Sequence, residues 1–200
     1  MRLMLQKSLK VPVTRIITPA CRGLLRLGFT ANAMSALGAC GSAISAIYFY
    51  THGKFFIGTL ITILFVLSDL FDGTMARLSG GGSKWGALLD STLDRITDSA
   101  ILGSVAYYLA KQNDRLVPVV LVALVSGGLV SYIKARAESL NIECNGGIAE
   151  RTERLIIAFL AIGLDGLSVP YALGIGMWIL AVASLYTTFE RMLIVYRASF

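Results

Sequence analysis

Long apolar stretches separated by short polar segments dominate the chain after residue 30. About 20 mostly apolar residues in a helix cross a bilayer. Six stretches have this character, at about 32–51, 54–76, 87–111, 115–139, 152–169 and 171–195. Glycine-containing polar segments at 79–83 and 143–147 separate the second stretch from the third and the fourth from the fifth. The pattern predicts an all-α integral membrane protein with six transmembrane helices.

The first 28 residues have a different pattern, in which apolar residues recur at three- and four-residue spacing as on one face of a helix. Arginines lie elsewhere on the wheel, so the segment is expected to lie in the membrane interface. A helical hairpin or a disordered tail is the alternative. The apolar positions are Leu9, Val13, Ile16, Ala20, Leu24 and Leu27, and the arginines are Arg15, Arg22 and Arg26. The predicted organisation is an amphipathic juxtamembrane helix over 1–28 and one transmembrane domain over 29–200.

Composition agrees with this interpretation, because 56% of the residues are hydrophobic and only 15% are charged, against roughly 25% charged in soluble domains. The net charge of +6 would suggest nucleic acid in a soluble protein. Here all 18 Lys and Arg except Lys54, Lys111 and Arg115 lie at or near one side of the predicted spans, as the positive-inside rule requires. We therefore expect a multi-pass protein of the cell (inner) membrane, with both termini cytoplasmic and no nucleic-acid partner.

Four carboxylates stand inside the predicted spans, where a charged residue is costly and by default functional. Asp69 and Asp72 are three residues apart near the end of the second span, and Asp90 and Asp94 are four apart at the start of the third. Each pair therefore shares a helix face. The loop at 79–83 makes the two helices antiparallel neighbours, so the four carboxylates can converge. Oxygen ligands of this kind suit Mg²⁺, Mn²⁺ or Ca²⁺ rather than Zn²⁺.

A buried set of ion pairs with Arg77 and Arg95 is the structural alternative, although two arginines do not offset four carboxylates. Gly73 and Ala76 lie on the helix face that carries Asp69, and their small size leaves room for a ligand or a close helix contact. Arg77 follows on that face, where its planar fork could bind a phosphate.

These residues form one regular pattern, with eight fixed positions in 26 residues. It reads Asp69-x-x-Asp72-Gly73-x-x-Ala76-Arg77, eight residues, then Gly86-x-x-x-Asp90-x-x-x-Asp94. The pattern resembles the signature of the CDP-alcohol phosphotransferases, and every fixed position is filled. The resemblance implies six transmembrane helices after an amphipathic helix, and a homodimer.

The resemblance also implies the site. Asp69, Asp72, Asp90 and Asp94 would hold two Mg²⁺ ions, with Mn²⁺ as the alternative, and Asp94 would be the catalytic general base. The implied residues for the CDP-linked lipid are Asn32, Ser35, Asp69, Gly73, Ala76, Arg77 and Ser83. Two metal ions can clamp a pyrophosphate, and a carboxylate can take the proton from an attacking hydroxyl.

A second polar group comes from three segments that share the cytoplasmic side in the predicted topology: 131–136, 150–154 and the region of Arg191. Basic side chains of this kind suit an acceptor that carries its own phosphate. The candidate ligands are Lys134, Arg136, Arg154 and Arg191. Positive-inside anchoring with Arg–Glu pairing is the alternative, and it stays open for Arg136 and Arg151.

The stretch from Ser131 to Glu138, with Glu150-Arg151-x-Glu153-Arg154-Leu155, is similar to the actinobacterial phosphatidylinositol phosphate synthase subfamily. That similarity implies CDP-diacylglycerol as donor and inositol 1-phosphate as acceptor. A phosphatidylglycerophosphate synthase, which uses glycerol 3-phosphate, is the alternative within the family. From another class, a divalent-cation transporter would need a polar path to the outer side, whereas the outer halves of the spans are apolar.

Overall fold

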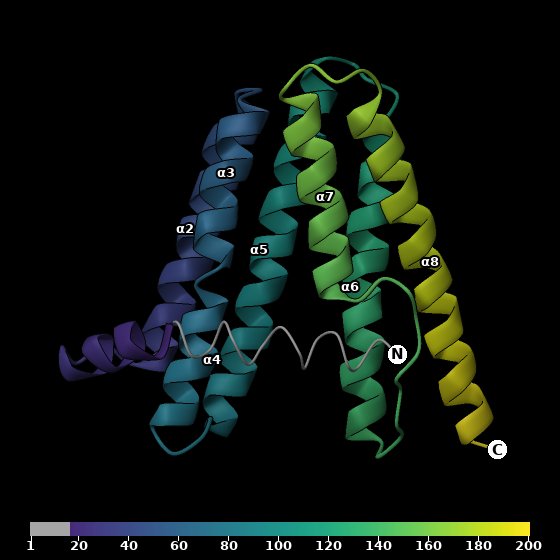
Figure 1. The fold of residues 1–200 in the computed structure, drawn as a ribbon. Coiled ribbons are helices and arrows are strands. Elements are labelled where there is room, and N and C mark those ends of the chain that lie inside the picture. The colour runs from purple at the N-terminus through teal and green to yellow at the C-terminus, as the bar shows by residue number, and fades with distance from the viewer. Residues whose placement is uncertain (1–16) are drawn as a thin grey trace. The chain divides into compact units, whose positions relative to one another are not determined.

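A computed structural model describes residues 17–200, except for the side chain of Asp69, and these residues form helices without any strand. A helix over residues 17–26 precedes the labelled helices of Figure 1. The labelled helices are α2 (Ala31–Thr51), α3 (Phe55–Val66), α4 (Asp69–Leu78), α5 (Lys84–Lys111), α6 (Val117–Ser139), α7 (Arg151–Asp165) and α8 (Ala172–Ala198). The predicted all-α class is confirmed for this part of the chain.

Each predicted span corresponds to helical structure, but only four segments of the described chain are both long and apolar enough to cross a membrane. These are Ala31–Thr51, Phe55–Leu78, Val117–Ser139 and Ala172–Ala198. Helix α7 has only 15 residues, and the N-terminal half of α5 carries several charges, among them Asp90, Asp94 and Arg95. The structure supports a multi-pass protein, while the count of six spans stays a prediction. Most of the predicted amphipathic helix, residues 1–16, lies outside the described residues.

The second predicted span is interrupted at residues 67 and 68, between α3 and α4. The N–H groups of Ser68 and Phe71 donate to carbonyls three residues back, at 3.0 and 2.8 Å, which tightens the backbone as in a 3₁₀ turn. The break coincides with a close helix contact, because a Cβ atom at Gly38 of α2 would overlap the side chain of Ser68. Asp69 therefore begins a new helix, α4.

The chain divides into two compact units. The first comprises Met1–Ser42 and Thr62–Thr97, and the second comprises Ala43–Ile61 and Asp98–Phe200. In the second unit α6, α7 and α8 pack together, and a Cβ atom at Gly176 of α8 would overlap Ala161 of α7. Small residues allow this close packing where apolar solvent gives no hydrophobic drive between helices.

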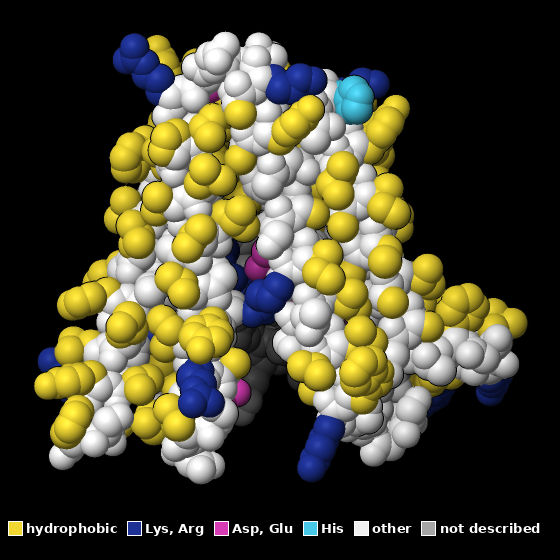
Figure 2. Space-filling model, turned by 180° about the vertical axis from the view of Figure 1, so that it is seen from behind, with side chains coloured by type: hydrophobic (Ala, Val, Ile, Leu, Met, Phe, Trp, Pro, Cys, Tyr) yellow, Lys and Arg dark blue, Asp and Glu magenta, His cyan; other side chains and the backbone are white. Residues whose placement is uncertain are grey.

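Large apolar side chains cover the outer surfaces of the helices, as Figure 2 shows for one face. Ile44, Leu64 and Phe189 are each more than 65% exposed. Contiguous apolar surface of this extent is unusual on a soluble monomer. In a bilayer, lipid chains would cover it.

Candidate active site

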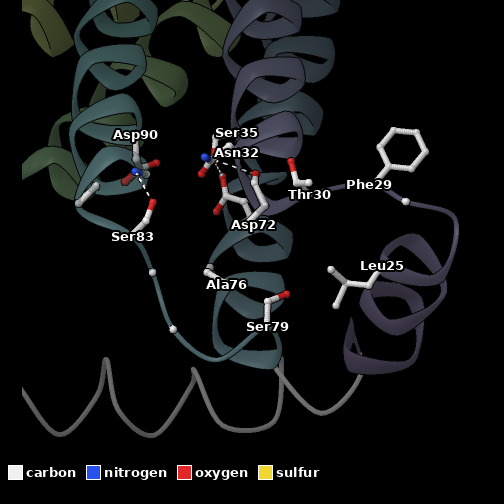
Figure 3. Close-up of a pocket in the computed structure, with 17 residues that line it drawn as sticks. Leu25, Phe29, Thr30, Asn32, Ser35, Asp72, Ala76, Ser79, Ser83 and Asp90 are labelled. Atoms are coloured by element: carbon white, nitrogen blue, oxygen red, sulfur yellow. Dashed lines mark hydrogen bonds between the residues drawn. The ribbon is translucent and has the colours of Figure 1, made fainter.

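A cavity of about 630 Å³ in the first unit is lined by residues from the end of the 17–26 helix, α2, α4, the 79–83 loop and α5 (Figure 3). Among its lining residues are seven that the sequence assigns to the site: Asn32, Ser35, Asp72, Gly73, Ala76, Ser83 and Asp90. Segments up to 65 residues apart in sequence, from Leu25 to Asp90, thus supply one cavity, and its polar lining comes largely from the predicted positions.

The carboxylates differ in their surroundings. Asp72 is only 7% exposed and accepts a hydrogen bond of 2.6 Å from Ser35 Oγ, whereas Asp90 is exposed and lines the cavity from α5. Figure 3 shows Asp72 and Asp90 on the two facing helices. Asp94, half-buried one turn further along α5, has an oxygen 3.6 Å from a guanidinium nitrogen of Arg95.

These oxygens fit a hard divalent cation, because a buried carboxylate next to a polar cavity is costly unless it is paired or binds a metal. Among the described side chains no group of three or more His, Cys, Asp or Glu residues gathers closely enough to hold a metal ion. That search does not include the side chain of Asp69, which lies outside the described part of the structure. The predicted four-carboxylate metal set therefore stays a prediction, supported by the placement of Asp72 and Asp90.

Local hydrogen bonds fix the helix starts that border the cavity. Thr30 Oγ1 accepts from the N–H of Ala33 at 3.2 Å and so caps the start of α2. Ser83 Oγ accepts from the N–H of Gly86 at 2.9 Å at the start of α5. A Cβ atom at Gly86 would lie 2.9 Å from Asn32 Oδ1 and 3.2 Å from Ser83 Oγ. The glycine of the motif is thus the residue that lets α5 approach α2.

Arg77 is exposed, and one of its terminal nitrogens donates to Thr74 Oγ1 at 3.0 Å. It is not among the residues that line the described cavity, and neither is Asp94. The helix over 17–26 contacts α4 through the Cys21 thiol, which donates to the carbonyl oxygen of Phe71 at 3.7 Å. Burial raises the pKa of that thiol, so it contributes as a neutral donor.

The second unit contains the predicted basic group. Arg191 is 2% exposed and donates from Nε to the carbonyl of Gly146 at 2.8 Å, and from its two terminal nitrogens to the carbonyl of Val130 at 2.8 Å and to Glu150 at 3.2 Å. Arg136 is exposed and donates to Ser139. Lys134 is half-buried on α6.

Arg154 is 7% exposed and is held from three sides within the same unit. One terminal nitrogen donates to the carbonyl of Ala149 at 3.1 Å, and the other lies 3.4 Å from Asp98 and 3.5 Å from Ser131 Oγ. A Cβ atom at Gly127 would lie 3.2 Å from its Nε. Arg154 and Arg191 therefore both lie in the second unit, as part of a network with acidic and carbonyl partners.

Asp98, which is not among the predicted site residues, pairs with both Arg151 and Arg154 at 3.4 Å. Its spacing could have indicated it, because Asp90, Asp94 and Asp98 follow one another at four-residue intervals on one helix face. The contributions of Leu25 and Phe29 to the cavity wall have no comparable sequence signal, since they depend on how the 17–26 helix packs.

The amino-acid sequence is similar to those of known proteins. The sequence profile described as CDP-alcohol phosphatidyltransferase matches residues 29–189. The phosphatidylinositol phosphate synthase of Streptomyces avermitilis is 43% identical over 205 residues, which cover 98% of this chain and 84% of that protein. The enzyme of the same name from Mycobacterium tuberculosis strain H37Rv is 44% identical over 183 residues, or 89% of this chain and 84% of that protein.

Solved structures of the Mycobacterium tuberculosis enzyme are similar throughout. The structure with CDP-DAG bound superposes with a TM-score of 0.88 at 43% identity and covers 91% of this chain and 94% of that one. The structure in complex with manganese and citrate gives a TM-score of 0.86 at 42% identity, over 90% of this chain and 88% of that one.

Proposed function

Because the chain belongs to the CDP-alcohol phosphatidyltransferase family, we propose that it transfers the phosphatidyl group of CDP-diacylglycerol to inositol 1-phosphate, releasing CMP and forming phosphatidylinositol phosphate. The observation that carries the proposal is the cavity lined by Asn32, Asp72 and Asp90. Relatives of 43–44% identity named phosphatidylinositol phosphate synthase support the choice of acceptor.

The donor occupies the cavity of the first unit in this proposal. Asn32 and Ser83 border it with polar groups, and Gly73 and Ala76 leave space for the CDP moiety. A Cβ atom at Gly73 would have only one neighbour within 4 Å, an Arg77 nitrogen at 3.7 Å, so the guanidinium of Arg77 is near enough to that wall to reach a phosphate. The similar structure that contains CDP-DAG supports this assignment.

The carboxylates Asp69, Asp72, Asp90 and Asp94 would hold two divalent cations, Mg²⁺ or Mn²⁺, and the manganese-containing relative supports a divalent metal. When bound, such ions neutralise pyrophosphate charge and stabilise the leaving CMP. Ser35 orients Asp72 by its 2.6 Å hydrogen bond. Asp94 acts as general base and takes the proton of the acceptor hydroxyl. At the same time the hydroxyl oxygen of the acceptor bonds to phosphorus, and the bond from phosphorus to CMP breaks.

The phosphate of the acceptor is bound by Lys134, Arg154 and Arg191, with Arg136 at the exposed end of α6. Arginine forks match phosphate oxygens in charge and geometry. Binding to Arg191 exchanges part of its present bonding to Gly146, Val130 and Glu150 for phosphate oxygens. Because these residues come from three helices, the acceptor phosphate also links α6, α7 and α8.

The proposed setting is the inner membrane, with six spans, an amphipathic N-terminal helix, and both termini and the active site on the cytoplasmic side. The uneven distribution of Lys and Arg supports this orientation. A homodimer completes the proposal, which rests for that point on the family resemblance alone.

The test is CMP release by the purified protein in detergent or vesicles containing CDP-diacylglycerol and Mg²⁺. Inositol 1-phosphate, free inositol and glycerol 3-phosphate are supplied in turn, and the lipid product is identified by mass. We expect the highest kcat/KM with inositol 1-phosphate and little activity with free inositol, since the basic side chains then lack their phosphate. Preference for glycerol 3-phosphate would replace the proposed function with phosphatidylglycerophosphate synthesis, and equal use of free inositol would remove the phosphate site.

A further inference from the structure

Asp98 lies on α5 in the second unit and contacts two arginines of α7. One oxygen lies 3.4 Å from Nε of Arg151, and the other lies 3.4 Å from a terminal nitrogen of Arg154. The carboxylate is mostly buried, with 18% of its side chain exposed. One acidic group thus joins two cations that are adjacent to each other on the same helix end.

Several neighbouring groups hold the guanidinium of Arg154 in one position. Gly127 of α6 leaves the space beside Nε, the carbonyl of Ala149 accepts from one terminal nitrogen, and Asp98 and Ser131 lie at the other. Of these neighbours only Asp98 carries a charge. Removing it would take a carboxylate away from a nearly buried cation, which is unfavourable in a low-dielectric environment.

Arginine has many rotamers, and ordering it at the moment of ligand binding costs free energy, so a side chain held in place beforehand binds more tightly. Asp98 holds the Arg154 side chain in place before the ligand binds. It contacts Arg154 from a different helix, α5, and so fixes the guanidinium relative to α6 and α7. Its carboxylate also balances part of the positive charge of the pair while no phosphate is bound.

We infer that Asp98 is a positioning residue for the acceptor: it fixes the guanidinium of Arg154 for the acceptor phosphate. The inference rests on the proposed function of Arg154 as a phosphate ligand. A carboxylate beside an arginine also competes with phosphate for the same N–H groups, and this competition alone would raise the acceptor KM of the parent. The sign of the change in acceptor KM therefore decides between positioning and competition.

The experiment measures KM for inositol 1-phosphate and for CDP-diacylglycerol in the parent, Asp98→Asn and Asp98→Glu, together with the melting temperature. Loss of order at one rotamer-rich side chain corresponds to a rise in acceptor KM of roughly threefold to tenfold for Asp98→Asn. We expect donor KM to stay within twofold or so of the parent value. Asp98→Glu keeps the charge at a shifted position and is expected to give an intermediate acceptor KM. Glu143→Gln, the same loss of charge at an exposed position, is the control and should behave as the parent.

A second measurement tests whether Asp98 acts through Arg154. In an Arg154→Ala background, Asp98→Asn should change kcat/KM for the acceptor no further. An effect that persists there overturns the inference, as does an unchanged or lower acceptor KM in Asp98→Asn alone, or a parallel rise of both KM values with a lower melting temperature. If Asp98→Asn does not fold, Asp98→Glu is judged by the same comparison.

Failure of the proposed function gives a separate result. The parent protein would then not use inositol 1-phosphate in the acceptor panel, whatever the Asp98 variants do. If the parent uses inositol 1-phosphate and the Asp98 variants leave its KM unchanged, only the inference about Asp98 fails.

Discussion

Buried charged side chains have different surroundings in the cavity of the first unit and around Arg154 and Arg191 in the second unit. Asp72 is buried beside open space and small residues, and a hydroxyl group donates to it. Arg191 is buried too, but carbonyl and carboxylate oxygens of the protein accept from all three of its nitrogens. In the first unit the buried charge lines a cavity, whereas in the second unit it is enclosed by hydrogen-bond acceptors of the chain itself.

Removal of divalent metal should have the largest effect, because the proposed metal ions balance the charge of the carboxylates in the first unit. We expect excess EDTA to abolish CMP release and added Mg²⁺ or Mn²⁺ to restore it. EDTA already saturated with Mg²⁺ is the control and should leave turnover intact. Full activity in excess free EDTA would mean that the carboxylates of this region work without metal.

Asp94→Asn should have the second-largest effect on turnover, since it keeps the shape of the side chain but removes the proposed base. A loss of about 10²- to 10⁴-fold in kcat is typical for a general base. Binding of CDP-diacylglycerol, measured directly, should remain close to that of the parent. Near-parental turnover would move the base to another group.

Arg154→Ala and Arg191→Ala test the second region. Each lost charge-assisted hydrogen bond costs about 1.5 to 3 kcal/mol, so we expect KM for inositol 1-phosphate to rise roughly ten- to a hundredfold while donor KM changes little. Arg191→Ala should also lower the melting temperature, because the carbonyls of Gly146 and Val130 lose their donor.

Arg197→Ala is the control for that pair, as it removes an exposed arginine from the last turn of α8. It should leave both KM values unchanged. If Arg191→Ala lowered stability but left acceptor KM as in the parent, Arg191 would serve the fold of the second unit and not the acceptor.

Gly86→Ala should have the smallest effect, and it tests whether the cavity needs the close approach of α5 to α2. The added Cβ atom would press on Asn32 Oδ1, and overpacking of about 1 kcal/mol corresponds to roughly a fivefold rise in donor KM. Gly103→Ala on the same helix meets nothing within 4 Å and should match the parent. Equal kinetics for the two variants would show that the contact between Gly86 and Asn32 does not matter.

Much of the site was accessible from the sequence because its signal is local. The spacing of Asp69, Asp72, Asp90 and Asp94 predicts which carboxylates share a helix face, and their oxygen ligands predict a divalent metal. Family resemblance added Asn32, Ser35 and Ser83, and all three line the cavity. The break at 67–68 was missed because neither proline nor glycine marks it, and it coincides with the contact to Gly38.

The sequence by itself determined that the chain is helical and apolar, the approximate positions of most of its helices, and which carboxylates share a helix face. Helical periodicity and hydropathy are properties of neighbouring residues, so a single chain displays them directly. Only the tertiary structure decided that Ser35 donates to Asp72, that Asp98 joins Arg151 and Arg154, and that Arg191 is enclosed by Val130, Gly146 and Glu150. The partners in these contacts are 37 to 61 residues apart, and only the packing of separate helices brings them within hydrogen-bonding distance.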